Sequence, residues 1–438
     1  MSMHAQGQVG MWARSGDRVP QPPLRRVEAA APPRDPEAGR RAFGINVLVV
    51  GMAFGLLFQI VILFIPHLVM SKHAGVEARA MLIGAGLAIP CLVAYAALPR
   101  IIDRYDPAPA WTLLLCLAWG AFGAGGWSLM INSVVDAVAS KAVSGAFGTL
   151  LTSCICAPVV EELTKGFAVF AMFYFMRRQF NGVVDGVVFG TFAALGFACF
   201  ENILYYSRAA TTEMLTTKEG LLLGQVIVRG VLKPWGHPLY TAITGLGFGI
   251  ARETNSRALK WLAPLGCYAV AVFLHSLWNT SVLLVGARLL PLFFLIVVAF
   301  FVLVLCLVRR EGKIIRDHLR DEVWIGNLTV WELGLVTSPI ARLRATFEFG
   351  GAAGRRFVDA AGRLALSKWH AGRAKQGRGR TISGEMILPL RQKLHELRAA
   401  VSVGRRWSAP RPQPMYVKSP SRREYRQEAQ HGWHPRRA

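Results

Sequence analysis

The chain has 438 residues, of which 53% are hydrophobic, and its formal net charge at pH 7 is +24. Soluble proteins of this length are more polar, so the composition argues against an ordinary soluble enzyme. In a soluble protein, a charge this positive would indicate nucleic-acid binding. Here long apolar runs indicate a membrane protein instead, and we expect no specific nucleic-acid binding.

The first segment, residues 1–41, is rich in Pro and Arg and lacks an early apolar core. A cleavable signal peptide requires such a core, so we expect none here and interpret the first apolar run as a signal anchor. The composition predicts that residues 1–41 are disordered and cytoplasmic.

Eight apolar runs follow, and each is long enough to cross about 30 Å of hydrocarbon. They lie near 44–69, 80–98, 111–132, 143–176, 183–206, 220–250, 261–285 and 289–308. Pro158 interrupts the fourth run, and Pro234 and Pro238 interrupt the sixth, so seven to nine spans are compatible with the pattern. The sequence therefore predicts an all-α fold, a polytopic membrane helix bundle of about eight transmembrane spans, with its membrane domain at 42–308.

The segment after residue 308 is strongly basic, with 27 Lys and Arg against 11 Asp and Glu. Because basic residues are retained on the cytoplasmic side, this excess predicts an integral cell-membrane protein with both termini in the cytoplasm. The tail either contacts anionic lipid headgroups of the bilayer or merely fixes this orientation.

Two patterns predict that residues 309–401 of the tail are partly helical. Thr329 and Glu332 have the spacing of a capping box at a helix N-terminus, and an apolar stripe at helical spacing is formed by Leu390, Leu394, Leu397 and Val401. Pro and Arg dominate residues 402–438, which we expect to be disordered.

Ionisable residues inside the apolar runs are few. An ionised side chain in hydrocarbon costs several kcal/mol, so such residues usually face the bundle interior and have a function. They are Glu161, Glu162 and Lys165 in the fourth run, Asp185 and Glu201 in the fifth, Arg229, Lys233 and His237 in the sixth, and His275, with Asn279 beside it, in the seventh.

The fourth run holds two adjacent carboxylates. Glu161 and Lys165 are four residues apart, so they can form an ion pair that serves only helix packing. Glu162 lies about 100° further round the helix and needs a partner of its own. Two neighbouring carboxylates in a low dielectric cannot both be ionised cheaply, and one of them can act as a general base or acid.

The fifth and sixth runs add an acid and an imidazole. Gly182, Gly186 and Gly190 recur every four residues and predict close helix packing, while Glu201 further along is either an interfacial acid or part of a polar site. His237 lies between two prolines, where a broken helix can line a cavity.

Arg229 and Lys233 share a face with His237. They can extend their charges to the interface as readily as they can serve a site, so we leave them out of the predicted site.

The seventh run places His275 and Asn279 one turn apart on one face. The pair can form a helix–helix contact or donate hydrogen bonds to a developing oxyanion. At 1.5 Å per residue, Glu161, His237 and His275 all reach the middle of the bilayer, and Glu201 lies nearer the outer side.

Four short motifs occur in order on successive runs: EELTK fits EExxK, FACFEN fits FxxxEN, HPLYTAITG has a His followed eight residues later by Gly, and HSLWN fits HxxxN. In this combination the chain resembles the PrsW family of bacterial intramembrane proteases, which is distantly similar to CAAX prenyl endopeptidases and Abi-type membrane proteins. The resemblance implies hydrolysis of a peptide bond in a membrane-associated protein, such as a single-pass anti-sigma factor. The site residues that it implies are Glu161, Glu162, Glu201, His237, His275 and Asn279.

Two arrangements of these groups can activate water, with Glu161 or Glu162 taking the proton. In a metalloprotease arrangement, Zn²⁺ is held by Glu201, His237 and His275 with one position open for water. In a glutamate-type arrangement no metal is needed, the histidines assist the carboxylate, and His275 and Asn279 bind the oxyanion. The HExxH zinc motif is absent from the sequence.

Two other classes of function use the same residue types. A proton-coupled membrane transporter also buries carboxylates and histidines on broken helices, although we find no inverted repeat in the sequence. A non-catalytic scaffold would use the motifs only to hold helices together.

Overall fold

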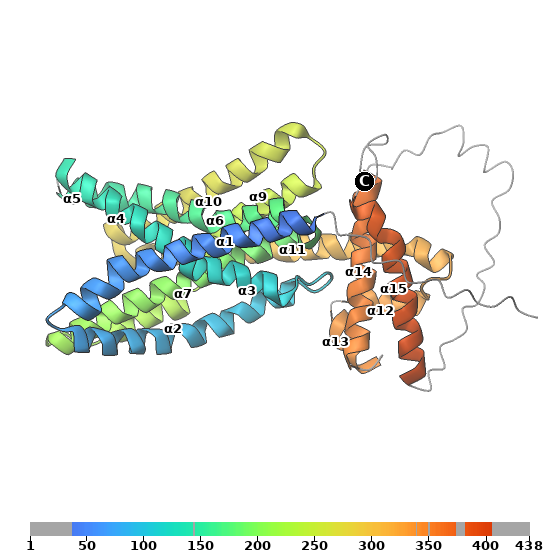
Figure 1. The fold of residues 1–438 in the computed structure, drawn as a ribbon, viewed down its shortest axis with the longest axis horizontal. Coiled ribbons are helices and arrows are strands. Elements are labelled where there is room, and N and C mark those ends of the chain that lie inside the picture. Colours follow the sequence, from blue (N-terminus) through green and yellow to red (C-terminus); the bar gives the residue numbers. More distant parts are fainter. Residues whose placement is uncertain (1–36, 143–144, 339, 349–350, 374–381, 405–438) are drawn as a thin grey trace, which may run out of the picture.

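The computed structural model describes residues 37–142, 145–338, 340–348, 351–373 and 382–404 (Figure 1). The disorder expected for 1–41 and 402–438 falls almost wholly outside these residues. At the edges of those two segments, residues 38–41 and 402–404 are helical.

The described residues form helices and no strands, which confirms the predicted all-α bundle. In chain order, the bundle consists of α1 (Ala38–Gln59) with η1 (Ile60–Met70), α2 (Ala74–Ile102), α3 (Ala110–Ala118) with η2 (Trp119–Ala124) and α4 (Gly125–Ala142), α5 (Gly145–Leu151) with η3 (Thr152–Cys156) and α6 (Ala157–Phe175), η4 (Arg177–Gln179), α7 (Val183–Leu215), α8 (Leu221–Gln225) with η5 (Val226–Leu232), α9 (Gly236–Glu253), α10 (Arg257–Val285), η6 (Gly286–Leu289) and α11 (Leu290–Trp324). The tail adds α12 (Val330–Val336), α13 (Ala341–Glu348), α14 (Gly351–Arg373) and α15 (Ile382–Gly404).

Among the described residues, six helical segments are long and apolar enough to cross a membrane: 38–70, 74–102, 110–142, 183–215, 257–285 and 290–324. The other two predicted runs correspond to α5–α6 and α8–α9, which carry charged residues of the predicted site. Each of the eight runs is thus helical, while the number of spans stays a prediction.

Helix α7 lies at the centre of the bundle, with 89% of its most apolar window buried. The glycines on its first half permit close contact with α9. A Cβ atom at Gly186 would lie 2.1 Å from the carbonyl oxygen of Gly245, and one at Gly190 would lie 2.5 Å from that of Thr241. This contact agrees with the close packing predicted from the glycine spacing, and it fixes α7 against the helix that carries His237.

Two local features set the ends of these helices. The sixth run is broken as its prolines predict, because η5 ends at Leu232 and α9 begins at Gly236. Asp185 caps the start of α7, where its Oδ2 accepts hydrogen bonds from the backbone N–H groups of Asn181 and Gly182. Asp185 is therefore a capping residue and not part of the central cluster.

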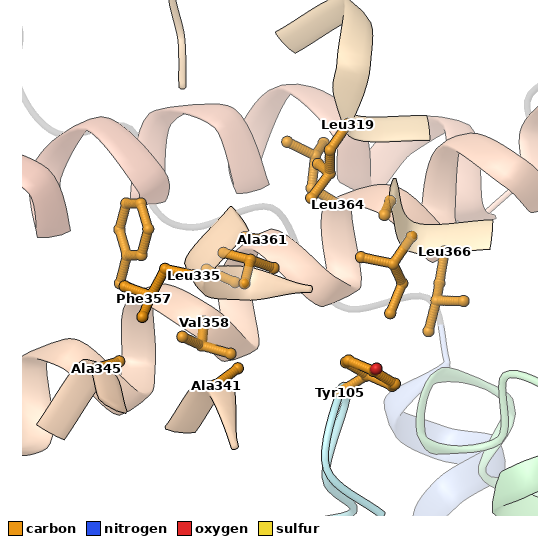
Figure 2. Close-up of a cluster of buried hydrophobic side chains, with 14 of the residues drawn as sticks. Tyr105, Leu319, Leu335, Ala341, Ala345, Phe357, Val358, Ala361, Leu364 and Leu366 are labelled. Carbon is orange, nitrogen blue, oxygen red and sulfur yellow. The ribbon is translucent and has the colours of Figure 1, made fainter. Parts of the chain in front are cut away.

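Helix α11 runs out of the bundle into the tail, whose helices pack around its far half (Figure 1). The core there includes Leu319, Leu335, Phe357 and Leu364, and Tyr105 from the loop after α2 joins it (Figure 2). The loop of the bundle and the tail therefore share one apolar core.

Both tail patterns are present in the structure. Thr329 Oγ1 accepts a hydrogen bond from the Glu332 N–H, and Glu332 Oε2 accepts one from the Thr329 N–H, so the predicted capping box opens α12. In α15, Leu390 and Leu394 are buried in the tail core and Leu397 packs against it.

Candidate functional site

Four helices bring buried ionisable side chains together near the middle of the bundle. Helix α6 supplies Glu161 and Glu162, α7 supplies Glu201, α9 supplies His237 and α10 supplies His275. All five side chains are linked through contacts of 3.8 Å or less when Lys165 on α6 is included. Five of the six predicted site residues therefore form one cluster.

Glu162 is the most constrained member of this cluster. Its Oε1 accepts a hydrogen bond from Lys165 Nζ at 2.6 Å and contacts His275 Nδ1 at 3.0 Å. Its Oε2 accepts a hydrogen bond from Thr241 Oγ1 at 2.8 Å. Because three donors surround a side chain with no exposed surface, this carboxylate is held in one position.

Lys165 pairs more closely with Glu162 than with Glu161, the partner predicted from helical spacing. Its Nζ is 2.6 Å from Glu162, three residues before it, and 3.8 Å from Glu161, four residues before it. Both spacings lie on one helix face, and the donors from α9 and α10 fix Glu162 where the ammonium reaches it. The predicted Glu161–Lys165 contact is thus present but long.

The hydrogen bonds of His237 assign its protons. Lys165 Nζ lies 3.1 Å from Nδ1, and an ammonium can only donate, so Nδ1 accepts. The proton of a neutral ring is then on Nε2, which lies 2.8 Å from Glu201 Oε2 and donates to it. Both nitrogens of His237 are therefore engaged.

His275 is oriented in the opposite way. Its Nδ1 faces the Glu162 carboxylate and donates to it, so the lone pair of a neutral ring is on Nε2. That nitrogen lies 3.8 Å from Glu161 Oε2, a buried oxygen without a hydrogen-bond partner among the described residues. A carboxylate behind a histidine commonly fixes the tautomer that presents Nε2 to a metal or water.

Asn279 makes no hydrogen bond to this cluster within the described part of the chain. Its Nδ2 donates to the carbonyl oxygen of Ser153 at 2.9 Å, which ties α10 to the turn before α6. The geometry favours a role in helix packing over the predicted oxyanion contact.

Three contributors were missed or set aside by the sequence interpretation. Arg229, excluded as interfacial, contacts Glu201 at 2.6 Å and donates to Asn202 Oδ1 at 2.8 Å. Thr241 donates a hydrogen bond to Glu162, and Tyr240 stacks on His275 with ring centroids 5.1 Å apart. Thr241 lies one helical turn after His237, and this spacing could have indicated that it shares a face with the site. Nothing in the sequence distinguishes Tyr240 from a packing residue.

Three members of the cluster could together hold a metal ion. One ligand atom each of Glu161, His237 and His275 lies within 4.8 Å of the others. Glu161 thus takes the place that the sequence interpretation gave to Glu201, which lies behind His237. The free oxygen of Glu161 and the Nε2 lone pair of His275 fit a zinc ion, and His237 joins them if Lys165 moves away from Nδ1.

A groove of about 630 Å³ lies beside the cluster. Glu162 and Thr164 of α6 are among its lining residues, and its walls are mostly apolar, with Trp127 on one side and Tyr268 on the other. The groove runs between α1 and α10 over the face of α6, so an apolar segment could approach the cluster from the lipid.

These features define a polytopic membrane helix bundle with a buried carboxylate–imidazole cluster. Residues 108–307 match the family described as PrsW family intramembrane metalloprotease. Over those residues the chain is similar to the PrsW family.

Curated relatives agree with this assignment. The chain is 32% identical over 135 residues to Protease PrsW of Halalkalibacterium halodurans, which is 31% of this chain and 56% of that protein. It is 28% identical to Protease PrsW of Geobacillus kaustophilus and 31% identical to that of Bacillus subtilis, over 28% and 26% of this chain and 49% and 47% of theirs. The chain thus matches about half the length of these relatives, and no solved structure matches it.

Proposed function

We propose that this protein is an intramembrane endopeptidase that hydrolyses a peptide bond of a membrane-associated protein. The observation that carries this proposal is the pair formed by Glu161 Oε2 and His275 Nε2. They are two buried acceptors 3.8 Å apart, and the carboxylate oxygen has no hydrogen-bond partner in the described residues. The names of the curated relatives support the same activity.

The two adjacent glutamates take different roles in this proposal. Glu161 accepts the proton of the attacking water, because its Oε2 is available and faces the lone pair of His275. Glu162 is a positioning residue, since its oxygens are occupied by Lys165, Thr241 and His275. By holding Nδ1 of His275, Glu162 directs Nε2 toward the reacting water.

The cationic side chains complete the electrostatics of the site. Lys165 lies between Glu162 and His237 and balances the carboxylate charge. Arg229 does the same for Glu201, which in turn accepts a hydrogen bond from His237 Nε2. Water attack on an amide develops negative charge on the carbonyl oxygen, and these fixed positive groups favour that charge without reorganisation.

A metal would be held by Glu161 and His275, with His237 as the third ligand. It would act as a Lewis acid and lower the pKa of bound water. With a metal bound, Glu162 would still orient His275 and Glu201 would still orient His237, while Glu161 would serve as a ligand.

The groove beside α6 supports a substrate that approaches from the lipid. Its aromatic and aliphatic lining suits an unwound stretch of a single-pass membrane protein, and an anti-sigma factor is one such substrate. Peptide bonds in an intact helix are shielded by their own hydrogen bonds, so we expect cleavage near a helix end or a Gly- or Pro-containing break.

Membrane proteomics of cells with the wild-type chain or with Glu161→Gln tests the activity. We expect a single-pass protein to persist uncleaved in the variant, while the purified variant unfolds at the wild-type temperature. Glu348→Gln, at the exposed C-terminal end of helix α13, is the matched control and should cleave normally. An unchanged membrane proteome combined with a loss of ion-coupled flux in Glu161→Gln would favour the transporter instead.

A further inference from the structure

A second cavity lies where the bundle meets the tail, and none of its described lining residues belongs to the carboxylate–imidazole cluster. Its volume is about 400 Å³. Its walls come from the loop after α6, the start of α1, the end of α9 and one face each of α14 and α15. In Figure 1, α14 crosses the end of the bundle from which α1 starts.

The charged residues that line this cavity are mainly cationic. The cations are Arg41, Arg177, Arg178, Arg252 and Arg363, and Asp106 is the one carboxylate among the described lining residues. Asp106 is already engaged, since its Oδ1 accepts from Arg363 Nε at 2.5 Å and its Oδ2 accepts from Asn181 Nδ2 at 2.6 Å. The lining therefore contains more cationic than anionic side chains.

Arg252 shows how this charge is held in place. Its Nε and a terminal nitrogen donate to the carbonyl oxygens of Phe180 and Arg177, at 2.8 and 3.0 Å. Glu37 and Asp185 are near enough to offset the guanidinium charge in part. The side chain shapes the 177–181 loop and keeps its positive charge beside the cavity.

His370 adds an imidazole ring to the wall of the same cavity. Its ring lines the cavity, and its Nε2 is buried without a hydrogen-bond partner among the described residues. Nearby Ser367 supplies a hydroxyl one turn earlier, and Met386 and Leu390 of α15 give the opposite wall an apolar surface. The cavity thus combines several cations, neutral polar groups and an apolar side.

We propose that this cavity binds a phosphate group, carried either by an anionic phospholipid headgroup or by a soluble phosphate compound. Guanidinium groups match phosphate oxygens with paired hydrogen bonds, and several converging arginines suit an anion with more than one negative charge. Basic pockets at the ends of transmembrane helices are common sites for anionic headgroups.

Binding there would join the tail to the helices of the proposed active site. The 177–181 loop directly follows α6, which carries Glu161 and Glu162, and Arg252 ends α9, which carries His237. An anion that contacts these elements together with Arg363 and His370 of α14 would stabilise their contact with the tail. The inference is independent of proteolysis, because the site and its occupant can be measured without a substrate.

The test uses the full chain in phosphatidylcholine nanodiscs, with either a minor fraction of phosphatidylglycerol or added inorganic pyrophosphate. Hydrogen exchange of residues 177–181 and of α14 is the readout, titrated against each anion. At least one anion is expected to increase protection in both segments. Response to phosphatidylglycerol alone identifies a lipid site, and response to pyrophosphate identifies a site for the phosphate group itself.

Variants separate a built site from general attraction to a basic surface. Arg177→Gln is expected to weaken the response about tenfold, because it removes one charged contact, and Arg355→Gln, on the exposed face of α14, should leave it unchanged. Ser367→Leu keeps every charge but fills the cavity, so it should abolish the response. This variant provides the test if Arg177→Gln perturbs folding. The proposal is overturned if neither anion adds protection, or if the Arg355 control loses as much as the cavity variants.

Discussion

Replacing Glu162 by Gln is expected to destabilise the whole bundle, whereas the same replacement at Glu161 is expected to leave its stability nearly unchanged. Glu162 and Lys165 are both fully buried and lie 2.6 Å apart. Removing one charge of such a pair leaves the other buried and unpaired, which costs about 3–5 kcal/mol. Glu161 Oε2 lies 3.8 Å from Lys165 and from His275 and has no hydrogen-bond partner among the described residues, so an amide there removes no hydrogen bond of this atom and should cost about 1 kcal/mol or less.

Thermal unfolding of both variants in nanodiscs, followed by circular dichroism, measures this difference, and cleavage of the substrate is measured in parallel. Both variants should lose cleavage, but only Glu162→Gln should show a large drop in unfolding midpoint. Adding Lys165→Met to Glu162→Gln removes the unpaired charge and should restore part of the stability without restoring cleavage. Equal midpoints for the two single variants would refute the separate roles given to the glutamates.

Three further predictions concern packing, metal and pH. Gly186→Val should lower the unfolding midpoint by separating α7 from α9, because even a Cβ would lie 2.1 Å from the Gly245 carbonyl oxygen; an unchanged midpoint would contradict that contact. Elemental analysis should find zinc in the purified wild-type protein and not in His275→Ala, and metal-free wild-type protein with full activity would leave only the glutamate-type arrangement. Burial lowers the pKa of His370 to about 4, and the nearby guanidinium groups of Arg252 and, to a smaller extent, Arg373 act in the same direction. A hydrogen bond to the Asn181 backbone opposes this shift. The unfolded tail therefore binds more protons between about pH 4 and 6.5, so stability of α14 should fall by about 2–3 kcal/mol as pH drops through that range; hydrogen exchange should show this loss in wild type and not in His370→Gln.

The sequence was sufficient to predict the helical segments and the approximate contents of the site. Apolar runs of membrane length set the eight helical segments, and Pro234 and Pro238 predicted the break before α9. Because burying charge in hydrocarbon is costly, the glutamates and histidines were predicted to converge in the bundle interior. Counting residues places Glu201 nearer the outer side of the membrane, whereas in the structure it accepts a hydrogen bond from His237.

The pairing within the site could not be predicted, because it depends on contacts between helices. Helical spacing allows Lys165 to reach either glutamate, and only Thr241 and His275 from other helices determine that Glu162 is the one held. The same holds for Arg229, whose partner Glu201 is 28 residues away on another helix. Such contacts leave no periodic signal in a single sequence.

The tail illustrates the same limit on a larger scale. Its capping box and its leucine stripe were predicted from local spacing, and both occur in α12 and α15. The tail packs against the bundle through Tyr105 in a short loop and through the pairing of Asp106 with Arg363, which is 257 residues further along the chain. The sequence predicts either that the tail contacts anionic headgroups or that it only fixes the orientation, and neither expectation includes a cavity between the tail and the bundle.

Cleavage by the purified protein tests the central claim most directly. The wild-type chain and Glu161→Gln, each reconstituted in nanodiscs with a single-pass protein found to persist in the variant cells, are compared by mass spectrometry of the products. The account predicts one dominant cut within or beside the membrane segment for wild type and none for Glu161→Gln. Equal cleavage by the two proteins would contradict it.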